Sequence, residues 1–174
     1  MNKPSAGPVW LQGAIAGVPP LLQPVAHALI EADQDAQALL ATLFTDEVWA
    51  RPHGIASVGF HIRHAMGSLD RLFTYARGEA LNETQLATLA SEKSMDRNTA
   101  TTAQLGTDFS AAVQKAIAQL RATSDSALLA PRDVGRAKLP SNVLGLLVHA
   151  GDHTYRHIGQ MITTAKVVKG MSAH

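Results

Sequence analysis

Four long stretches with helical periodicity, separated by proline and glycine, favour an all-helical fold for this chain. Apolar residues recur every three or four positions over residues 21–43, 57–78, 101–123 and 142–168, as on the buried face of an amphipathic helix. Proline and glycine interrupt the chain between the stretches and end helices that would otherwise continue. No segment alternates apolar and polar residues for long enough to predict a sheet. We therefore expect an all-α four-helix bundle.

The connections between these segments indicate how the bundle is organised. Roughly a dozen residues join the first two segments, whereas about twenty separate the second from the third. A link of that length permits a crossover in place of a tight hairpin, and it has room for a short helix over residues 83–91. We expect one domain over residues 1–174, in which residues 1–20 form an N-terminal arm and residues 169–174 a flexible tail.

The second segment has signals for both of its ends and for its exposed face. Ser57 belongs to the residue types favoured at a helix N-cap, and Gly78 to those that end a helix. In the turn before this segment, Trp49 is predicted to anchor the core. The solvated face of the segment is predicted to carry the charged residues Arg63, Asp70, Arg71 and Arg77.

Composition excludes several partners and several kinds of chemistry. A formal net charge of +1 gives no basis for nucleic acid or an anionic membrane as a partner. No stretch approaches the ~20 apolar residues that cross a bilayer. The chain has no cysteine, so it forms no disulfide and offers no thiolate ligand or nucleophile. The sequence therefore predicts a cytoplasmic protein in which any metal is held by histidine and carboxylate groups.

The last segment contains the sequence HAGDHTYRHIGQM, in which three histidines follow one another at four-residue intervals. In a helix these residues form a column. His153 and His157 fall on the apolar side, whereas His149 lies at its rim. His149 and His157 are ~12 Å apart along the axis, too far to share one ion. Buried imidazoles need partners, so His153 and His157 are predicted to bind a metal; a structural role in the core is the alternative.

A third ligand is expected from the second segment, which offers His61 and His64 in GFHIRHAMGSLD. On a helical wheel His61 lies nearer the middle of the apolar stripe and His64 lies at its edge. The wheel slightly favours His61, although an edge position at the open end of a bundle also suits a ligand. The remaining histidines are predicted to be surface or turn residues: His27, His53 and His174.

Two motifs together resemble a known family. HTYRHIGQM is similar to the HxxxHxGQ signature in the last helix of DinB-like metal-binding proteins. ASVGFHIRHAMGSLDRLFTYARG is similar to their second helix, in which serine starts the helix and a histidine seven residues later binds metal. The similarity extends from about Leu11 to Val168. It implies an up-down-down-up four-helix bundle with a long crossover between helices 2 and 3.

The resemblance also implies one divalent metal ion held by His64, His153 and His157. Zinc and nickel both suit imidazole ligands, and the residue types do not distinguish them. The resemblance and the wheel disagree at the third ligand; we follow the resemblance and expect His61 beside the ligands. Gln160 matches the glutamine of the motif and is expected to orient a ligand or a metal-bound water.

Three functions are compatible with such a site. Enzymes of this family use the metal to activate a low-molecular-weight thiol, and other members have no established activity. The leading hypothesis is therefore a metal-dependent enzyme acting on a small molecule, similar to a thiol S-transferase. The alternatives are a hydrolase that uses metal-bound water and a non-catalytic stress or structural protein, which allows a homodimer. No catalytic residue is predicted, because Asp152 points about 100° away from His153 on the wheel.

Overall fold

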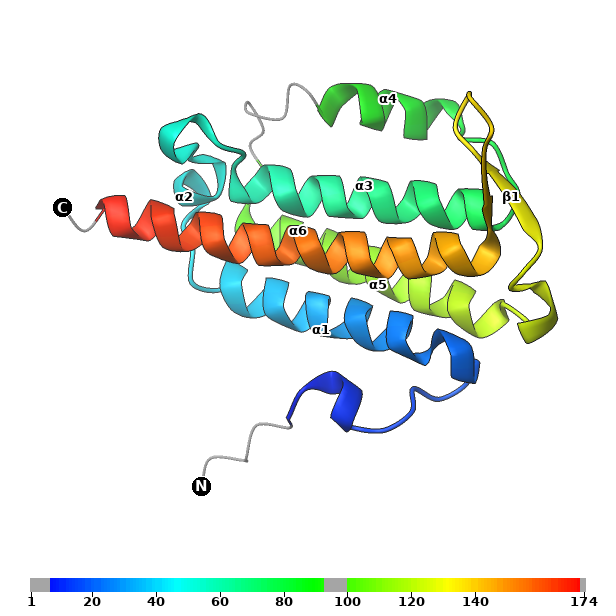
Figure 1. Cartoon of the computed structure of the whole chain (residues 1–174). Helices are drawn as coiled ribbons and strands as arrows, with labels where there is room; N and C mark the ends of the chain where they lie inside the picture. Colours follow the sequence, from blue (N-terminus) through cyan, green and yellow to red (C-terminus); the bar gives the residue numbers. More distant parts are fainter. Residues whose placement is uncertain (1–6, 93–99, 173–174) are drawn as a thin grey trace.

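The computed structural model describes residues 7–92 and 100–172, which form six α-helices and one short β-hairpin (Figure 1). The helices are α1 (Gln23–Leu40), α2 (Thr45–Trp49), α3 (Val58–Ala76), α4 (Glu83–Ser91), α5 (Thr102–Ala122) and α6 (Val143–Ser172). The predicted all-α class is confirmed, and α4 covers the residues expected for the short helix in the long link. Within the described ranges, no helix is both long and apolar enough to cross a membrane.

Four long helices enclose the core. Both α1 and α3 pack against α5 and α6, and the most extensive contact joins α3 to α6. Figure 1 shows that α1 and α6 run towards the end of the bundle where the C-terminus lies, whereas α3 and α5 run the opposite way. The link between α3 and α5 contains α4, which runs back along α3. Because α3 and α6 are neighbours along their length, His64 on α3 can lie close to His153 and His157 on α6.

The ends of α3 follow from the predicted signals. The Ser57 hydroxyl oxygen accepts a hydrogen bond from the Phe60 amide at 3.1 Å, which satisfies one of the unpaired donors of the first turn. Gly78 follows the helix with φ +81°, a conformation that glycine adopts without steric cost. Both predictions are confirmed.

The last helix is longer than expected. α6 begins after Asn142, whose side-chain oxygen accepts a hydrogen bond from the Gly145 amide at 2.7 Å, and continues through Ser172. It therefore passes the predicted end at residue 168 and includes part of the expected tail. The Lys169 ammonium group donates to the Thr42 carbonyl at 2.7 Å, which attaches this last turn to the end of α1. His174 and residues 1–6 of the expected arm lie outside the described ranges.

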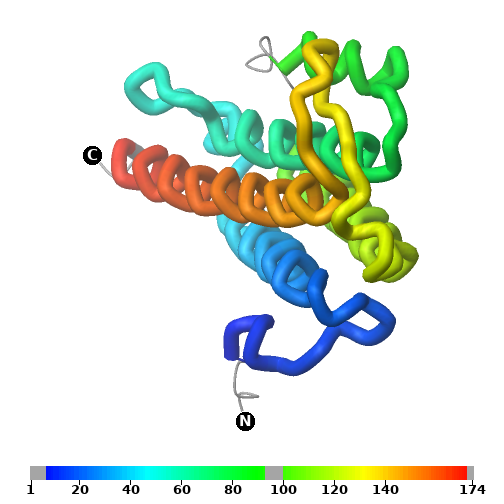
Figure 2. The backbone as a smooth tube through the Cα atoms, turned by 45° about the vertical axis from the view of Figure 1, so that its right-hand side comes forward, coloured from blue at the N-terminus to red at the C-terminus, as the bar shows by residue number. Residues whose placement is uncertain are grey.

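The prediction that the chain has no sheet is wrong for one segment. Strands β1 (Pro131–Val134) and β2 (Leu139–Asn142) pair antiparallel, with Pro131 opposite Asn142. Each strand has only four residues and contains a proline, so the sequence has no run of alternation that would predict it. Arg132 donates from Nε to the Ala76 carbonyl at 2.8 Å. The hairpin is thereby joined to the end of α3, next to α4 (Figure 2).

Trp49 anchors the first turn of α3, as predicted. Its ring packs against the buried core, and its indole N–H donates to the Ala100 carbonyl at 3.0 Å. The ring lies against Gly59, where an added Cβ would come within 2.3 Å of Trp49 Cζ3. Gly59 therefore allows the indole to reach the helix backbone.

The Gly59→Ala substitution should lower the free energy of unfolding by about 1–3 kcal/mol, because the new methyl group overlaps the Trp49 ring. Urea denaturation in the presence of a chelator measures this change. Gly159→Ala is the matched control, since its Cβ would meet no atom within 4 Å; it should raise stability by about 0.5–1 kcal/mol. Equal stabilities of the two variants would contradict the packing described.

Candidate metal centre

Three histidines from α3 and α6 come together on the side of the bundle where these helices are in contact. Nε2 of His64 lies 3.0 Å from Nε2 of His153, and the His157 ring centroid lies 4.5 Å from that of His64 and 4.6 Å from that of His153. One nitrogen of each ring lies within 4.8 Å of the other two. The four-residue spacing on α6 places His153 and His157 side by side, and His64 faces both from α3.

The charge state of these rings suits a metal ion. Burial, followed by the charges of neighbouring histidines, lowers the pKa of His157 to about 4. Burial and the nearby His64 also lower the pKa of His153. Both rings are therefore neutral at neutral pH and keep an electron pair for a ligand bond. Bond lengths of ~2.1 Å bring the ligand atoms of one ion within ~4 Å of each other, close to the separations found here. The cluster is compatible with metal binding.

His61 lies behind this cluster. Its side chain is buried, and its Nδ1 lies 3.2 Å from Nδ1 of His157. A hydrogen bond between these atoms leaves Nε2 of His157 for an ion. The helical wheel therefore correctly placed His61 deeper in the apolar stripe than His64. It is nevertheless His64, at the edge of the stripe, that joins His153 and His157 in the cluster. The contact suits the predicted place of His61 beside a ligand.

Sequence reasoning missed Glu92, which follows α4 and contacts His64 through a buried carboxylate. Its Oε2 lies 2.9 Å from Nδ1 of His64, and its Oε1 accepts from the Arg71 guanidinium at 2.7 Å. Burial alone would raise the pKa of Glu92, but the hydrogen bonds from His64 and Arg71 outweigh this effect and lower it. An ionised carboxylate on Nδ1 fixes the ring with the Nε2 electron pair towards the other histidines. Glu92 therefore orients His64.

The predicted solvated face of α3 is wrong for Arg71. This residue is buried and forms the ion pair with Glu92, so its charge is neutralised inside the protein rather than by water. Gly67 makes room for the pair, because a Cβ there would lie 2.8 Å from Nη1 of Arg71 and 2.9 Å from Oε1 of Glu92. Gly67, a glycine in the middle of α3, is thus the one feature of the sequence that indicates the close approach of Arg71 and Glu92.

Replacing Glu92 by glutamine should weaken metal binding about 10–100-fold, the usual loss when a partner of a ligand is removed. The glutamine amide retains the shape but not the negative charge that holds the His64 ring. Competition with a chelator of known affinity measures the change. Glu83→Gln, at the exposed start of α4, should leave the affinity unchanged. If Glu92→Gln binds metal as tightly as the parent protein, Glu92 does not support the site.

The other residues singled out in the sequence lie further out. His149 is about half exposed, and its Nδ1 lies 3.7 Å from the Asp152 carboxylate, which pairs with Arg156. Gln160 is exposed and lines, with His61 and Arg156, a surface hollow of about 510 Å³. Its predicted role towards a ligand stays a prediction.

Comparison with known proteins shows similarity to one family model and to solved structures. The model of a family described as the DinB superfamily matches residues 19–161. The crystal structure of a conserved protein from Enterococcus faecalis is similar, with a TM-score of 0.70 and 19% sequence identity over 86% of this chain and 97% of that chain. At this identity the structural likeness shows the fold alone. No curated protein matches the sequence.

Proposed function

Because the chain belongs to the DinB superfamily, we propose that it is a metal-dependent enzyme whose ion is held by His64, His153 and His157. The observation that carries the proposal is the convergence of three ring nitrogens within 4.8 Å. One divalent ion per chain, zinc or nickel, is part of the proposal. The three side chains are only partly buried, so a small molecule can reach them from solvent.

The protein contributes the position of the three ligands and the lowered pKa of His153 and His157. Glu92 orients His64 through Nδ1, and His61 contacts His157 through Nδ1. Three neutral imidazoles leave the charge of a divalent ion uncompensated, and such an ion lowers the pKa of a thiol or a water molecule that reaches it.

A thiol is the better fit as the activated group. Activating water usually requires a nearby base, yet Glu92 is engaged by His64 and Arg71, and Asp152 pairs with Arg156 on the exposed side of α6. A thiol starts from a pKa of ~8.5, far below that of water, and needs less assistance. Since the chain has no cysteine, the thiol arrives with a cosubstrate. We therefore propose transfer of a low-molecular-weight thiol to an electrophile.

Metal analysis followed by an activity screen tests the proposal. Elemental analysis should find about one divalent ion per chain, which a chelator removes and added zinc or nickel restores. The protein is then assayed with thiol–electrophile pairs and with esters, with and without the ion, using His157→Ala as the inactive control. Thiol transfer that requires the ion supports the proposal. Ester hydrolysis alone would assign a hydrolase, and turnover of neither class would leave a structural metal site.

A further inference from the structure

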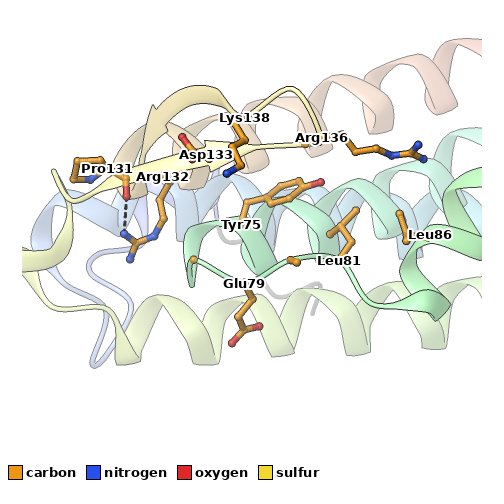
Figure 3. Close-up of a pocket in the computed structure, with 12 residues that line it drawn as sticks. Tyr75, Glu79, Leu81, Leu86, Pro131, Arg132, Asp133, Arg136 and Lys138 are labelled. Carbon is orange, nitrogen blue, oxygen red and sulfur yellow. Dashed lines mark hydrogen bonds between the residues drawn. The ribbon is translucent and has the colours of Figure 1, made fainter.

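A second pocket lies near the far end of α3 from the histidines, between α4 and the β-hairpin (Figure 3). Its volume is about 820 Å³, within the range of ~300–1,000 Å³ typical of small-molecule sites. Tyr75 lines it and stands eleven residues after His64, which corresponds to ~16 Å along the helix. The pocket is therefore separate from the metal centre. We refer to it as the hairpin pocket.

One side of the hairpin pocket is apolar. It is formed by Tyr75 of α3, by Leu81 in the loop that follows, and by Leu86 of α4. Leu86 is 42% exposed, so its apolar surface is available to a ligand. Figure 3 shows the Tyr75 ring below the hairpin, with Leu81 and Leu86 beyond its hydroxyl end. These side chains form a surface on which an apolar ligand group loses contact with water.

The hairpin supplies positive charge on the opposite side. Arg136 and Lys138 line the pocket and are exposed, and among the described residues no carboxylate lies within ion-pair distance of either. The turn that carries them is closed by a hydrogen bond from the Lys138 amide to the Gly135 carbonyl at 3.2 Å. Figure 3 shows the Lys138 side chain above Tyr75, whereas the Arg136 side chain points away from the Tyr75 ring, on the side of Leu86.

The acidic residues at the pocket do not cancel this charge. Glu79 pairs with Arg77, and Figure 3 shows its side chain pointing away from the hairpin. The remaining carboxylate is that of Asp133, while Arg132 adds a third cation that donates to the Ala76 carbonyl. Three cations and one carboxylate on the hairpin give a field that favours an anion.

We propose that the hairpin pocket binds a small amphipathic carboxylate. The apolar part of the ligand lies on Tyr75, Leu81 and Leu86, and its carboxylate pairs with Arg136 and Lys138. The residues that line the hairpin pocket take no part in the proposed metal chemistry, so this binding is a separate property of the protein.

Calorimetric titration with decanoate, below its micelle concentration, tests the proposal. Decanol and decyltrimethylammonium carry an apolar chain that is one methylene longer and lack the negative charge. Decanoate should bind saturably at one site per chain and about tenfold more tightly than either. Combining Arg136→Gln and Lys138→Gln should weaken decanoate about tenfold, the scale of two partly exposed ion pairs. Lys166→Gln, an exposed cation on α6, is the control and should change nothing.

Equal binding of the three probes, or no effect of the double substitution, would overturn the proposal. Sedimentation with vesicles of anionic phospholipid, without saturable binding of decanoate, would also overturn it and assign the hairpin to a lipid surface. The titrations are repeated after chelation, and saturable binding that depends on Arg136 and Lys138 should persist. This result separates the hairpin pocket from the metal centre, because a failure of the proposed enzyme function would leave it intact.

Discussion

Replacement of His157 by alanine should leave the protein essentially without bound metal after dialysis, and His153→Ala should do the same. Each substitution removes one of three proposed ligand bonds. Affinity should therefore fall by more than the ~10–100-fold that accompanies loss of a ligand's partner. Elemental analysis gives the metal content, and competition with a chelator gives the affinity. Stoichiometric metal in His157→Ala at unchanged affinity would refute the site.

His149→Ala is the matched control for this result. His149 lies on the same helix, one turn before His153, with a ring centroid 5.4 Å from that of His153. It is about half exposed beside Asp152 and is not part of the group whose nitrogens converge. The variant should keep its metal. Loss of metal in His149→Ala but not in His157→Ala would move the site by one helical turn.

Replacement of His64 by alanine should weaken metal binding by well over 100-fold, and that of His61 by only about 10–100-fold. Nε2 of His64 lies 3.0 Å from Nε2 of His153, whereas His61 contacts His157 through Nδ1 from behind. Metal titration of the two variants in parallel measures the difference.

His61 needs a second substitution, because it is only 8% exposed and alanine would leave a cavity that destabilises the fold. His61→Gln retains most of the volume and a polar group. It should fold with near-parental stability and show only the modest loss of affinity. A greater loss in His61→Gln than in His64→Ala would make His61 the third ligand, as the helical wheel alone favours.

The long helices could be predicted because their determinants are local. Ser57 caps α3 through a bond to a residue three positions away, and the apolar period of α5 is visible in any short window of the sequence. The hairpin could not be predicted in this way. Its register depends on pairing over a turn with a left-handed residue, Lys138 at φ +48°, and four-residue strands give no detectable period.

The candidate site likewise has a part that could be predicted from local sequence and a part that could not. His153 and His157 stand one helical turn apart, so their proximity follows from helix geometry alone. Glu92 is 28 positions from His64, and no periodicity relates the two. Arg71 looked like a surface charge because the helix wheel does not show that α4 covers that side of α3. Only the packing of α4 brings the carboxylate, the guanidinium and the imidazole together.

The manner in which α4 is attached has a thermodynamic consequence. None of its residues from Glu83 to Ser91 is buried. It is held on α3 by Gln85, which donates to Asp70 and Thr74, and by Glu92 just after it. A helix with so few buried contacts opens locally at a low free-energy cost compared with the core. An ion that prefers the closed arrangement raises the cost of opening, so metal occupancy and the folding of this peripheral helix form one linked equilibrium.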